Sequence, residues 1–362
     1  MRSWCSREHD LDGTMGQQGF WDVDERLEKL ASKQDLLKRL NTLVPWETFR
    51  PILARIHEKP RKSNAGRKPI DGVLLFKMLV LQKLYNISDE DLEYQVNDRL
   101  SFMQFLNLGL EDSVPDATTV WLFRKQLQTH DLVDELFEHF AAYLAAAGYQ
   151  AQDGQIVDAT LIPVPKQRNT RTENQTIKQG DVPSEWQEQP HKVAQKDVDA
   201  RWTKKNGVSH YGYKNHISSD VRYNFIRRYT VTDAAVHDSQ VLGELLDADN
   251  TGDGVWADSA YLSTLIVEVL TLMGFEPQIN ERAYRNRPLN DEQKSANRER
   301  SKTRAKVEHI FGDWVTDMGG KLVRTIGLAR AKVNLGLKNL TYNLKRFVCL
   351  ETQSDAATET VG

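Results

Sequence analysis

Cysteine and long apolar stretches are both scarce in this sequence, and each scarcity excludes a class of protein. Cys5 and Cys349 are the only two cysteines among 362 residues, and they lie at opposite ends of the chain. They form neither a disulfide framework nor a cysteine-based zinc pattern. No stretch approaches the roughly 18 apolar residues of a membrane-spanning helix, and the N-terminus has no apolar signal region. We therefore expect a cytoplasmic protein without a membrane partner.

Excess charge of one sign is also missing from the chain as a whole, but the charges are unevenly distributed. The formal net charge is only −3. Residues 233–299 contain thirteen acidic and five basic residues, whereas residues 300–346 contain eleven basic and three acidic ones. A basic segment that follows an acidic one suggests a polyanionic partner beside a carboxylate-rich site. Counting alone does not separate this interpretation from an ordinary solvated helix face.

The length and the hydrophobic pattern predict two domains with unstructured ends. Composition indicates disorder at both termini, where small and polar residues prevail. The pattern between them changes from helical to strand-like near Gln150. The expected units are a disordered leader (1–22), an all-helical domain (23–148), a domain with a sheet (149–350) and a disordered tail (351–362).

Within the first domain, apolar residues recur at helical spacing. Residues 72–86 are apolar nearly all round, which is typical of a buried helix. Ser88 and Asp116 are the expected N-caps of two further helices. The helix after them carries leucine and phenylalanine on one stripe and is expected to end at Gly148.

The second domain is predicted from short β-branched runs. The first strand is expected at 154–164, and an antiparallel hairpin and two further strands follow it. The polar segment 166–195 is too long for an ordinary turn, so it is predicted to be a functional or disordered loop. The later strands are expected at 210–220, 224–234, 252–261 and 275–280.

Three carboxylates occupy positions that a folded sheet could bring together. Asp158 and Asp258 each come directly after the apolar run of a predicted strand, and Glu308 lies at the edge of the apolar stripe of a later helix. Taken alone, each aspartate is more commonly a turn or helix cap, and Glu308 with Arg304 is more commonly a surface ion pair. Together, three carboxylates repel unless cations neutralise them, and oxygen ligands favour Mg²⁺ or Mn²⁺. Two such ions, about 3.5–4 Å apart, support phosphodiester chemistry.

The blocks "IVDAT", "WADSAY" and "RAKVEHIF" resemble, in this order, the three catalytic blocks of DDE transposases from bacterial insertion sequences. The nearest group is the one named for insertion sequence five, and the similarity runs from about residue 66 to 348. The resemblance implies an α+β or α/β class with an RNase H-like mixed sheet flanked by helices. It also implies an N-terminal helical DNA-binding domain. Carried over by position, Asp158, Asp258 and Glu308 would be the catalytic residues and the ligands of two Mg²⁺ or Mn²⁺ ions.

Around Glu308 the sequence departs from the Tyr-Arg-Glu-Lys pattern of related transposases. Arg304 matches the arginine four residues before the glutamate, but Ser301 stands at the tyrosine position and Val315 at the lysine position. Lys321 or Arg324 is the candidate replacement for the missing phosphate contact.

Further DNA-binding candidates are basic residues in three segments. Lys306 is one of the basic neighbours of Glu308. Arg67 and Lys68 resemble an arm that inserts into the minor groove, although a flexible basic linker explains them about as well. Arg124 and Lys125 lie in a possible recognition helix, with Val120, Leu122 and Phe123 on its apolar side; a core helix of the first domain is an equal alternative.

Two other polar residues are expected to approach the carboxylates. Lys214 and His216 lie on one side of the predicted second strand and would face the site. Asp238 is interpreted as a helix N-cap rather than a fourth ligand. The histidines show no tight metal spacing, so a zinc site is not expected.

The leading hypothesis is a transposase that binds terminal inverted repeats and target DNA and catalyses strand cleavage and transfer. It would act in the bacterial cytoplasm on the nucleoid, as a homodimer or larger assembly on double-stranded DNA. The alternatives are a non-catalytic DNA-binding regulator derived from a transposase and a structure-specific nuclease of the same fold.

Overall fold

The computed structural model describes residues 29, 35–57, 69–205, 207–285 and 287–359, with the backbone alone for residues 355–359. The predicted leader at 1–22, together with Arg67 and Lys68, lies outside these residues. Within this part of the chain, no helix combines the length and the apolar character needed to cross a membrane.

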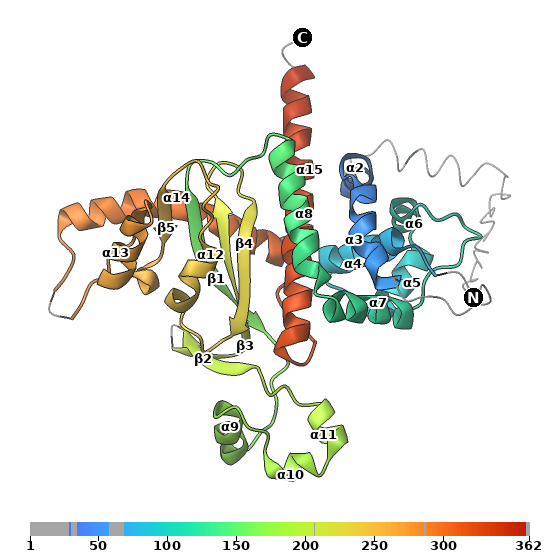
Figure 1. The fold of residues 1–362 in the computed structure, drawn as a ribbon, viewed down its shortest axis with the longest axis horizontal. Helices are drawn as coiled ribbons and strands as arrows, with labels where there is room; N and C mark the ends of the chain where they lie inside the picture. Colours follow the sequence, from blue (N-terminus) through green and yellow to red (C-terminus); the bar gives the residue numbers. More distant parts are fainter. Residues whose placement is uncertain (1–28, 30–34, 58–68, 206, 286, 360–362) are drawn as a thin grey trace, which may run out of the picture.

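Helices form the N-terminal region, as the sequence predicts (Figure 1). Ser88 caps α5 by accepting the Asp91 N–H, and Asp116 caps α7 by accepting the Thr119 N–H. The predicted apolar helix is buried on nearly every side. The helices are α2 (Leu36–Leu43), α3 (Arg50–Ala54), α4 (Gly72–Tyr85), α5 (Asp89–Asp98), α6 (Leu100–Leu106), α7 (Ala117–Thr129) and α8 (Leu132–Ala146).

A mixed sheet of six strands follows, in the order β2-β3-β1-β5-β6, with β4 also paired to β3. Strand β3 runs antiparallel to β1, β2 and β4, whereas β5 runs parallel to both β1 and β6. This mixed sheet, flanked by helices and preceded by a helical region, confirms the predicted fold class. The strands are β1 (Gln155–Pro163), β2 (Arg201–Lys205), β3 (Val208–Asp220), β4 (Ile226–Asp233), β5 (Gly254–Ala257) and β6 (Glu276–Ile279).

Each face of the sheet packs against a different pair of helices. Ile156 and Ile162 of β1 belong to the large core that includes α14 (Asp291–Thr316) and α15 (Leu328–Glu359). Val157, between them, faces the smaller core with α12 (Leu242–Leu245) and α13 (Thr264–Leu272). Because side chains alternate along a strand, even-numbered β1 residues face α14.

Helix α15 joins the two predicted domains. It packs against β4 of the sheet and against α2, α4, α7 and α8 of the N-terminal region (Figure 1). One hydrophobic core therefore runs without a break from Leu37 to Val348. The predicted disordered tail at 351–362 is helical through Glu359. Tertiary contacts hold this last part: Tyr149 donates to Glu351 at 2.6 Å, and Arg39 donates to Thr352 at 3.1 Å.

A buried amide fixes α15 to the sheet. Asn343 accepts the Ile226 N–H at 2.9 Å and donates to the Ile226 carbonyl at 2.8 Å. We expect Asn343→Leu to cost about 2–4 kcal/mol of unfolding free energy, because both backbone groups lose their partner. Denaturant unfolding measures this loss. The exposed Asn97→Leu, which breaks a bond within one helix, is the control and should change stability by about 0.5 kcal/mol or less. Equal effects of the two would contradict the role of Asn343.

The polar segment after β1 is partly helical, where the sequence indicated a functional or disordered loop. It forms α9 (Arg171–Lys178), α10 (Ser184–Gln187) and α11 (Pro190–Ala194), which lie below the sheet in Figure 1. Trp186 is fully buried, and its indole N–H donates to Glu173 at 2.6 Å. Glu173 also closes a capping box with Thr170. One tryptophan and one capping carboxylate thus order a segment with few aliphatic residues.

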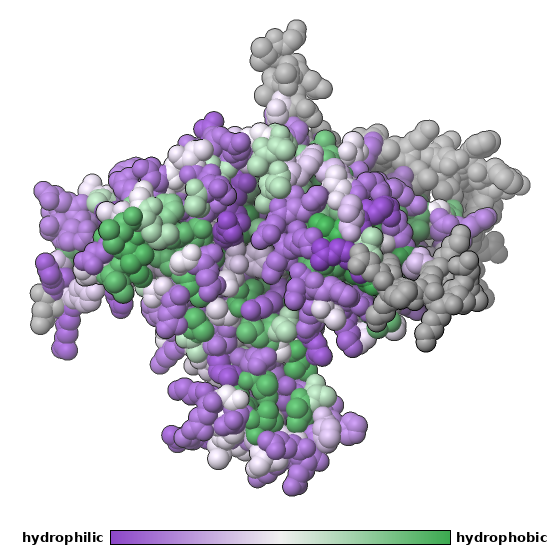
Figure 2. Space-filling model, in the orientation of Figure 1, coloured by the Kyte–Doolittle hydropathy of each residue, from purple (hydrophilic) through white to green (hydrophobic). Residues whose placement is uncertain are grey.

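The visible surface is mostly polar, with a hydrophobic area over α13 (Figure 2). Leu265, Val269, Leu272 and Met273 are exposed there. Their spacing places them on one side of the helix, while Leu270 packs into the smaller core. Helix α13 therefore presents an apolar stripe to the outside of the molecule.

Candidate functional site

The two aspartates lie side by side on neighbouring parallel strands, with Asp158 inside β1 and Asp258 directly after the carboxyl end of β5. Gln155 is opposite Val255, and Ile156 is opposite Trp256. The same register, continued by two residues, sets Asp158 beside Asp258. Asp258 also caps a short 3₁₀ turn by accepting the Ala260 N–H at 2.8 Å. The cap that the sequence suggested is therefore present, and it does not remove Asp258 from the site.

Helix α14 brings Arg304 and Glu308 to the same end of the sheet. Val307 and Ile310 are buried against the core that contains Ile156, which orients the helix. The Arg304 guanidinium lies 3.2 Å from Asp158 and 3.2 Å from Glu308. The Asp158 side chain is 17% exposed, whereas that of Glu308 is 64% exposed. Arg304 therefore links a half-buried carboxylate of the sheet to an exposed carboxylate of the helix.

Burial raises the pKa of Asp158 to about 6, and repulsion from Asp258 adds to this increase. The Ala159 N–H, which donates to Asp158 at 2.7 Å, lowers the pKa, as do the charges of Arg304 and Lys205. These interactions together do not restore the ordinary value of 3.8. The negative charge of Asp158 is thus incompletely compensated by the chain itself.

The arrangement fits a hard divalent cation at the aspartate pair. The donors are carboxylate oxygens, which suit Mg²⁺ and Mn²⁺, and their uncompensated charge is what a cation would neutralise. Among the residues described, no three carboxylates, histidines or cysteines stand close enough together to hold one ion. Glu308 is joined to the pair through Arg304 instead. Of the three predicted carboxylates, Asp158 and Asp258 are therefore neighbours, and Glu308 is connected to Asp158 through Arg304.

Two lysines lie near Asp158. Lys321 donates to Thr160 at 2.8 Å, two residues beyond Asp158 and on the same face of β1. Burial lowers the pKa of Lys321, and so does the charge of Lys205, while Asp158 opposes this shift. Lys205 was missed in the sequence because "RWTKK" has no apolar alternation to mark strand β2. The stretch 199–220, which contains Lys205, also resembles the transposase family, and this is the signal that could have identified it.

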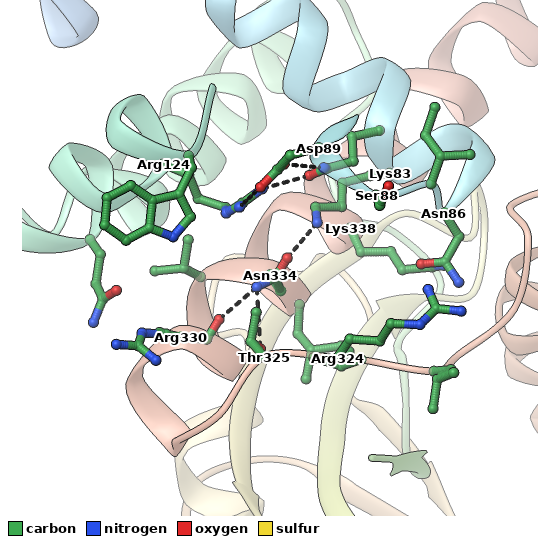
Figure 3. Close-up of a pocket in the computed structure, with 18 of the residues that line it drawn as sticks. Lys83, Asn86, Ser88, Asp89, Arg124, Arg324, Thr325, Arg330, Asn334 and Lys338 are labelled. Atoms are coloured by element: carbon green, nitrogen blue, oxygen red, sulfur yellow. Dashed lines mark hydrogen bonds and ion pairs between the residues drawn. The ribbon is translucent and has the colours of Figure 1, made fainter. Parts of the chain in front are cut away.

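The remaining basic candidates do not gather at the aspartates. Lys306 donates to the Val221 carbonyl at 2.9 Å, at the turn between β3 and β4. Arg124, Lys125 and Arg324 line a separate cleft (Figure 3). Arg124 is bound there to Asp89 at 2.5 Å.

The apolar side of α7 differs from the prediction at one position. Val120 and Phe123 are buried as expected, but Leu122 is exposed. The reason is helical geometry: the buried stripe continues from Val120 and Phe123 to Leu127, and Leu122 points the other way.

Lys214 and His216 lie on the opposite face of the sheet from Asp158. They pair in register with Leu161 and Ala159, whose side chains point away from α14. Lys214 binds Asp238 at 2.8 Å, and burial lowers the pKa of His216 to about 4. The expectation that these residues face the site was wrong. Asp238 is likewise not the helix cap, since His237 caps that turn.

Comparison with known proteins gives two family matches. Residues 25–126 match the model of a family described as a transposase domain, and residues 149–344 match the model described as a transposase DDE domain. The second range contains Asp158, Asp258 and Glu308. Among solved structures, the chain is similar to the cryo-EM structure of a piggyBac transposase synaptic complex with hairpin DNA. That alignment has 12% identity and a TM-score of 0.45, and it covers 90% of this chain and 77% of that one.

Proposed function

The chain belongs to the DDE transposase family, and on this premise we propose that Asp158, Asp258 and Glu308 form its DNA-cutting centre. The supporting observation is the parallel register that sets Asp158 beside Asp258, with Arg304 connecting Asp158 to Glu308. Bound at these carboxylates, two Mg²⁺ or Mn²⁺ ions would activate water and stabilise the leaving oxygen of a phosphodiester.

The residues of the chain have separate tasks in this proposal. Asp158 and Asp258 would hold the cations, and Glu308 would join them once Arg304 released the carboxylates. The Arg304 guanidinium then binds a DNA phosphate, for which its planar donors are suited. Lys321 and Lys205 bind neighbouring phosphates and take the place of the lysine that the family pattern has seven residues after the glutamate.

The proposed partner is double-stranded DNA at two stages. The terminal inverted repeats are bound first, with the N-terminal helical region supplying recognition, and target DNA is bound at strand transfer. The insertion sequence five group, action on the bacterial nucleoid and a homodimer or larger assembly on DNA stay predictions. Contacts to phosphates position the duplex, and contacts to bases determine which DNA sequence is bound.

A cleavage assay tests this function. The substrate is a labelled duplex carrying the DNA that flanks the reading frame, and a scrambled duplex is the control. We expect cleavage at the repeat end in Mg²⁺ or Mn²⁺, and none in EDTA. Specific binding without cleavage in either metal would instead support the regulator, and cleavage without strand transfer would support the nuclease. Cleavage that continues in EDTA would contradict the metal-dependent mechanism.

A further inference from the structure

A second basic site lies between the N-terminal helices and the chain that connects α14 to α15. The end of α4 and helix α7 form one wall, and residues 321–326 with the first turns of α15 form the other (Figure 3). The cavity has a volume of about 530 Å³. None of the residues assigned to metal binding lines it.

The cleft has more positive charge than its acids neutralise. Arg124 is paired with Asp89 at 2.5 Å. Lys83 is buried and donates to Asn334, and burial together with the charges of Arg124 and Lys338 lowers its pKa to about 7.

Three further cations of the cleft are exposed and are not paired with an acid. Arg324, Arg330 and Lys125 form no ion pair with any described acidic residue, and the Arg330 guanidinium donates only to a backbone carbonyl, at 3.3 Å. The cleft can therefore bind an anion without breaking an existing ion pair.

An aromatic side chain lies at the same cleft. Trp121 is 43% exposed, although the adjoining stripe of α7 is buried. The Lys125 ammonium lies 5.2 Å from the centre of its ring. An exposed indole among basic side chains is the combination with which proteins hold unpaired nucleotides, because bases stack on the ring while cations bind the backbone.

Size and position restrict what the cleft can hold. Its volume lies within the range of about 300–1,000 Å³ that is typical of pockets for small ligands. A double helix, whose major groove alone is about 12 Å wide, does not fit. One end of the cleft reaches the proposed cutting centre, because Lys321 lines the cleft and also donates to Thr160 beside Asp158.

We propose that this cleft binds unpaired nucleotides of one DNA strand, as the strand leaves the duplex near Asp158. Trp121 stacks on a base, and Lys125, Arg324 and Arg330 bind its neighbouring phosphates. The inference rests on the proposed function for the identity of the strand, but the site itself is separate from the metal-binding carboxylates.

Binding by the full-length protein tests the proposal. Two labelled duplexes of the same sequence are compared by fluorescence anisotropy, one blunt and one with a single-stranded extension of a few nucleotides. We expect tighter binding of the extended duplex. Trp121→Ala should weaken that binding about 5- to 150-fold, the equivalent of one stacked base, and leave the blunt duplex unaffected. Leu122→Ala is the matched control, because Leu122 is the next residue, is 45% exposed and does not line the cleft.

A second pair of variants tests the phosphate contacts. Arg330→Gln should reduce the slope of log K against log salt for the extended duplex by about 0.7, the value for one contact to a single strand. Lys332→Gln is its control, because Lys332 is exposed on the same helix and lines a different cavity with Asp134 and Glu138.

Equal binding of the two duplexes, or equal effects of Trp121→Ala and Leu122→Ala, would overturn the proposal. A protein that binds the extended duplex more tightly but shows no metal-dependent cleavage would count against the proposed cutting centre. It would not count against the proposed role of the cleft. The two failures are therefore distinguishable.

Discussion

Asp158→Asn, Asp258→Asn and Glu308→Gln are each expected to reduce strand cleavage by about 10³-fold or more and to leave DNA binding almost unchanged. Each substitution keeps the size of the side chain and removes one negative ligand. A bound metal ion contributes several kcal/mol of transition-state stabilisation, and each 1.36 kcal/mol corresponds to tenfold in rate. Affinity for DNA comes mainly from lysine and arginine contacts to phosphates, which these variants retain.

The matched control for Glu308→Gln is Glu299→Gln. Glu299 lies on the same helix, is exposed and forms a surface ion pair with Lys302. Cleavage and repeat binding are measured on the same preparations. A triad variant that cuts as fast as Glu299→Gln would remove that carboxylate from the centre. A variant that remains folded but loses binding would mean that the carboxylate supports the DNA interface instead.

Asp158→Asn is expected to stabilise the metal-free protein above neutral pH. The pKa of Asp158 is raised from 3.8 to about 6 in the folded chain. A raised carboxyl pKa stabilises the fold below the unfolded value, and this contribution is lost as the pH rises through about 6. The cost at pH 8 is about 3 kcal/mol at most, since one pKa unit corresponds to about 1.4 kcal/mol. The variant also weakens the contact between position 158 and Arg304, so its gain in unfolding free energy is smaller than this value.

Denaturant unfolding in EDTA, at pH 8 and at pH 4, measures this difference. The variant should be more stable at pH 8, and the difference should shrink at pH 4, where the wild-type carboxyl is largely protonated. Addition of Mg²⁺ or Mn²⁺ at pH 8 should stabilise the wild type more than the variant. A wild type that is the more stable of the two at pH 8 in EDTA would show that the ion pair with Arg304 outweighs the cost of burial.

The aspartates could be predicted from sequence because strand ends are a local signal. That expectation holds for Asp258, which directly follows β5, whereas Asp158 lies inside β1, and the parallel register rather than a shared strand end brings the two together. Glu308 was identified from its position beside an apolar stripe and from the family resemblance. The contact between Arg304 and Asp158 depends on tertiary packing. It cannot be predicted from the spacing of Arg304 and Glu308 along one helix.

Errors arose where register or long-range packing decides the outcome. Lys214 and His216 were placed on the wrong face because a shift of one position along a strand reverses every side chain. The cleft was not predicted, because its residues come from α7 and from the connector before α15 and meet only when α15 packs. Residues beyond 350 were expected to be disordered from their composition, because the sequence does not reveal their contacts with the distant residues Tyr149 and Arg39.

Helix α15 holds the N-terminal helices and the sheet together. It fills the space between the N-terminal helices and β4, and its buried residues belong to both parts of the core. A fragment that ends near residue 148 would expose the faces of α4 and α8 that α15 covers. The substitutions are therefore made in the full-length chain.

The most direct test of the central claim is Mn²⁺ binding by the protein alone at pH 8, measured from the free-ion signal in electron paramagnetic resonance. At this pH Asp158 is ionised, since its pKa is about 6. The wild type and Glu299→Gln are expected to bind Mn²⁺ equally, and Asp158→Asn and Asp258→Asn to lose most of that binding. Mn²⁺ binding that is unchanged in both aspartate variants would contradict the assignment of this carboxylate pair as the metal centre.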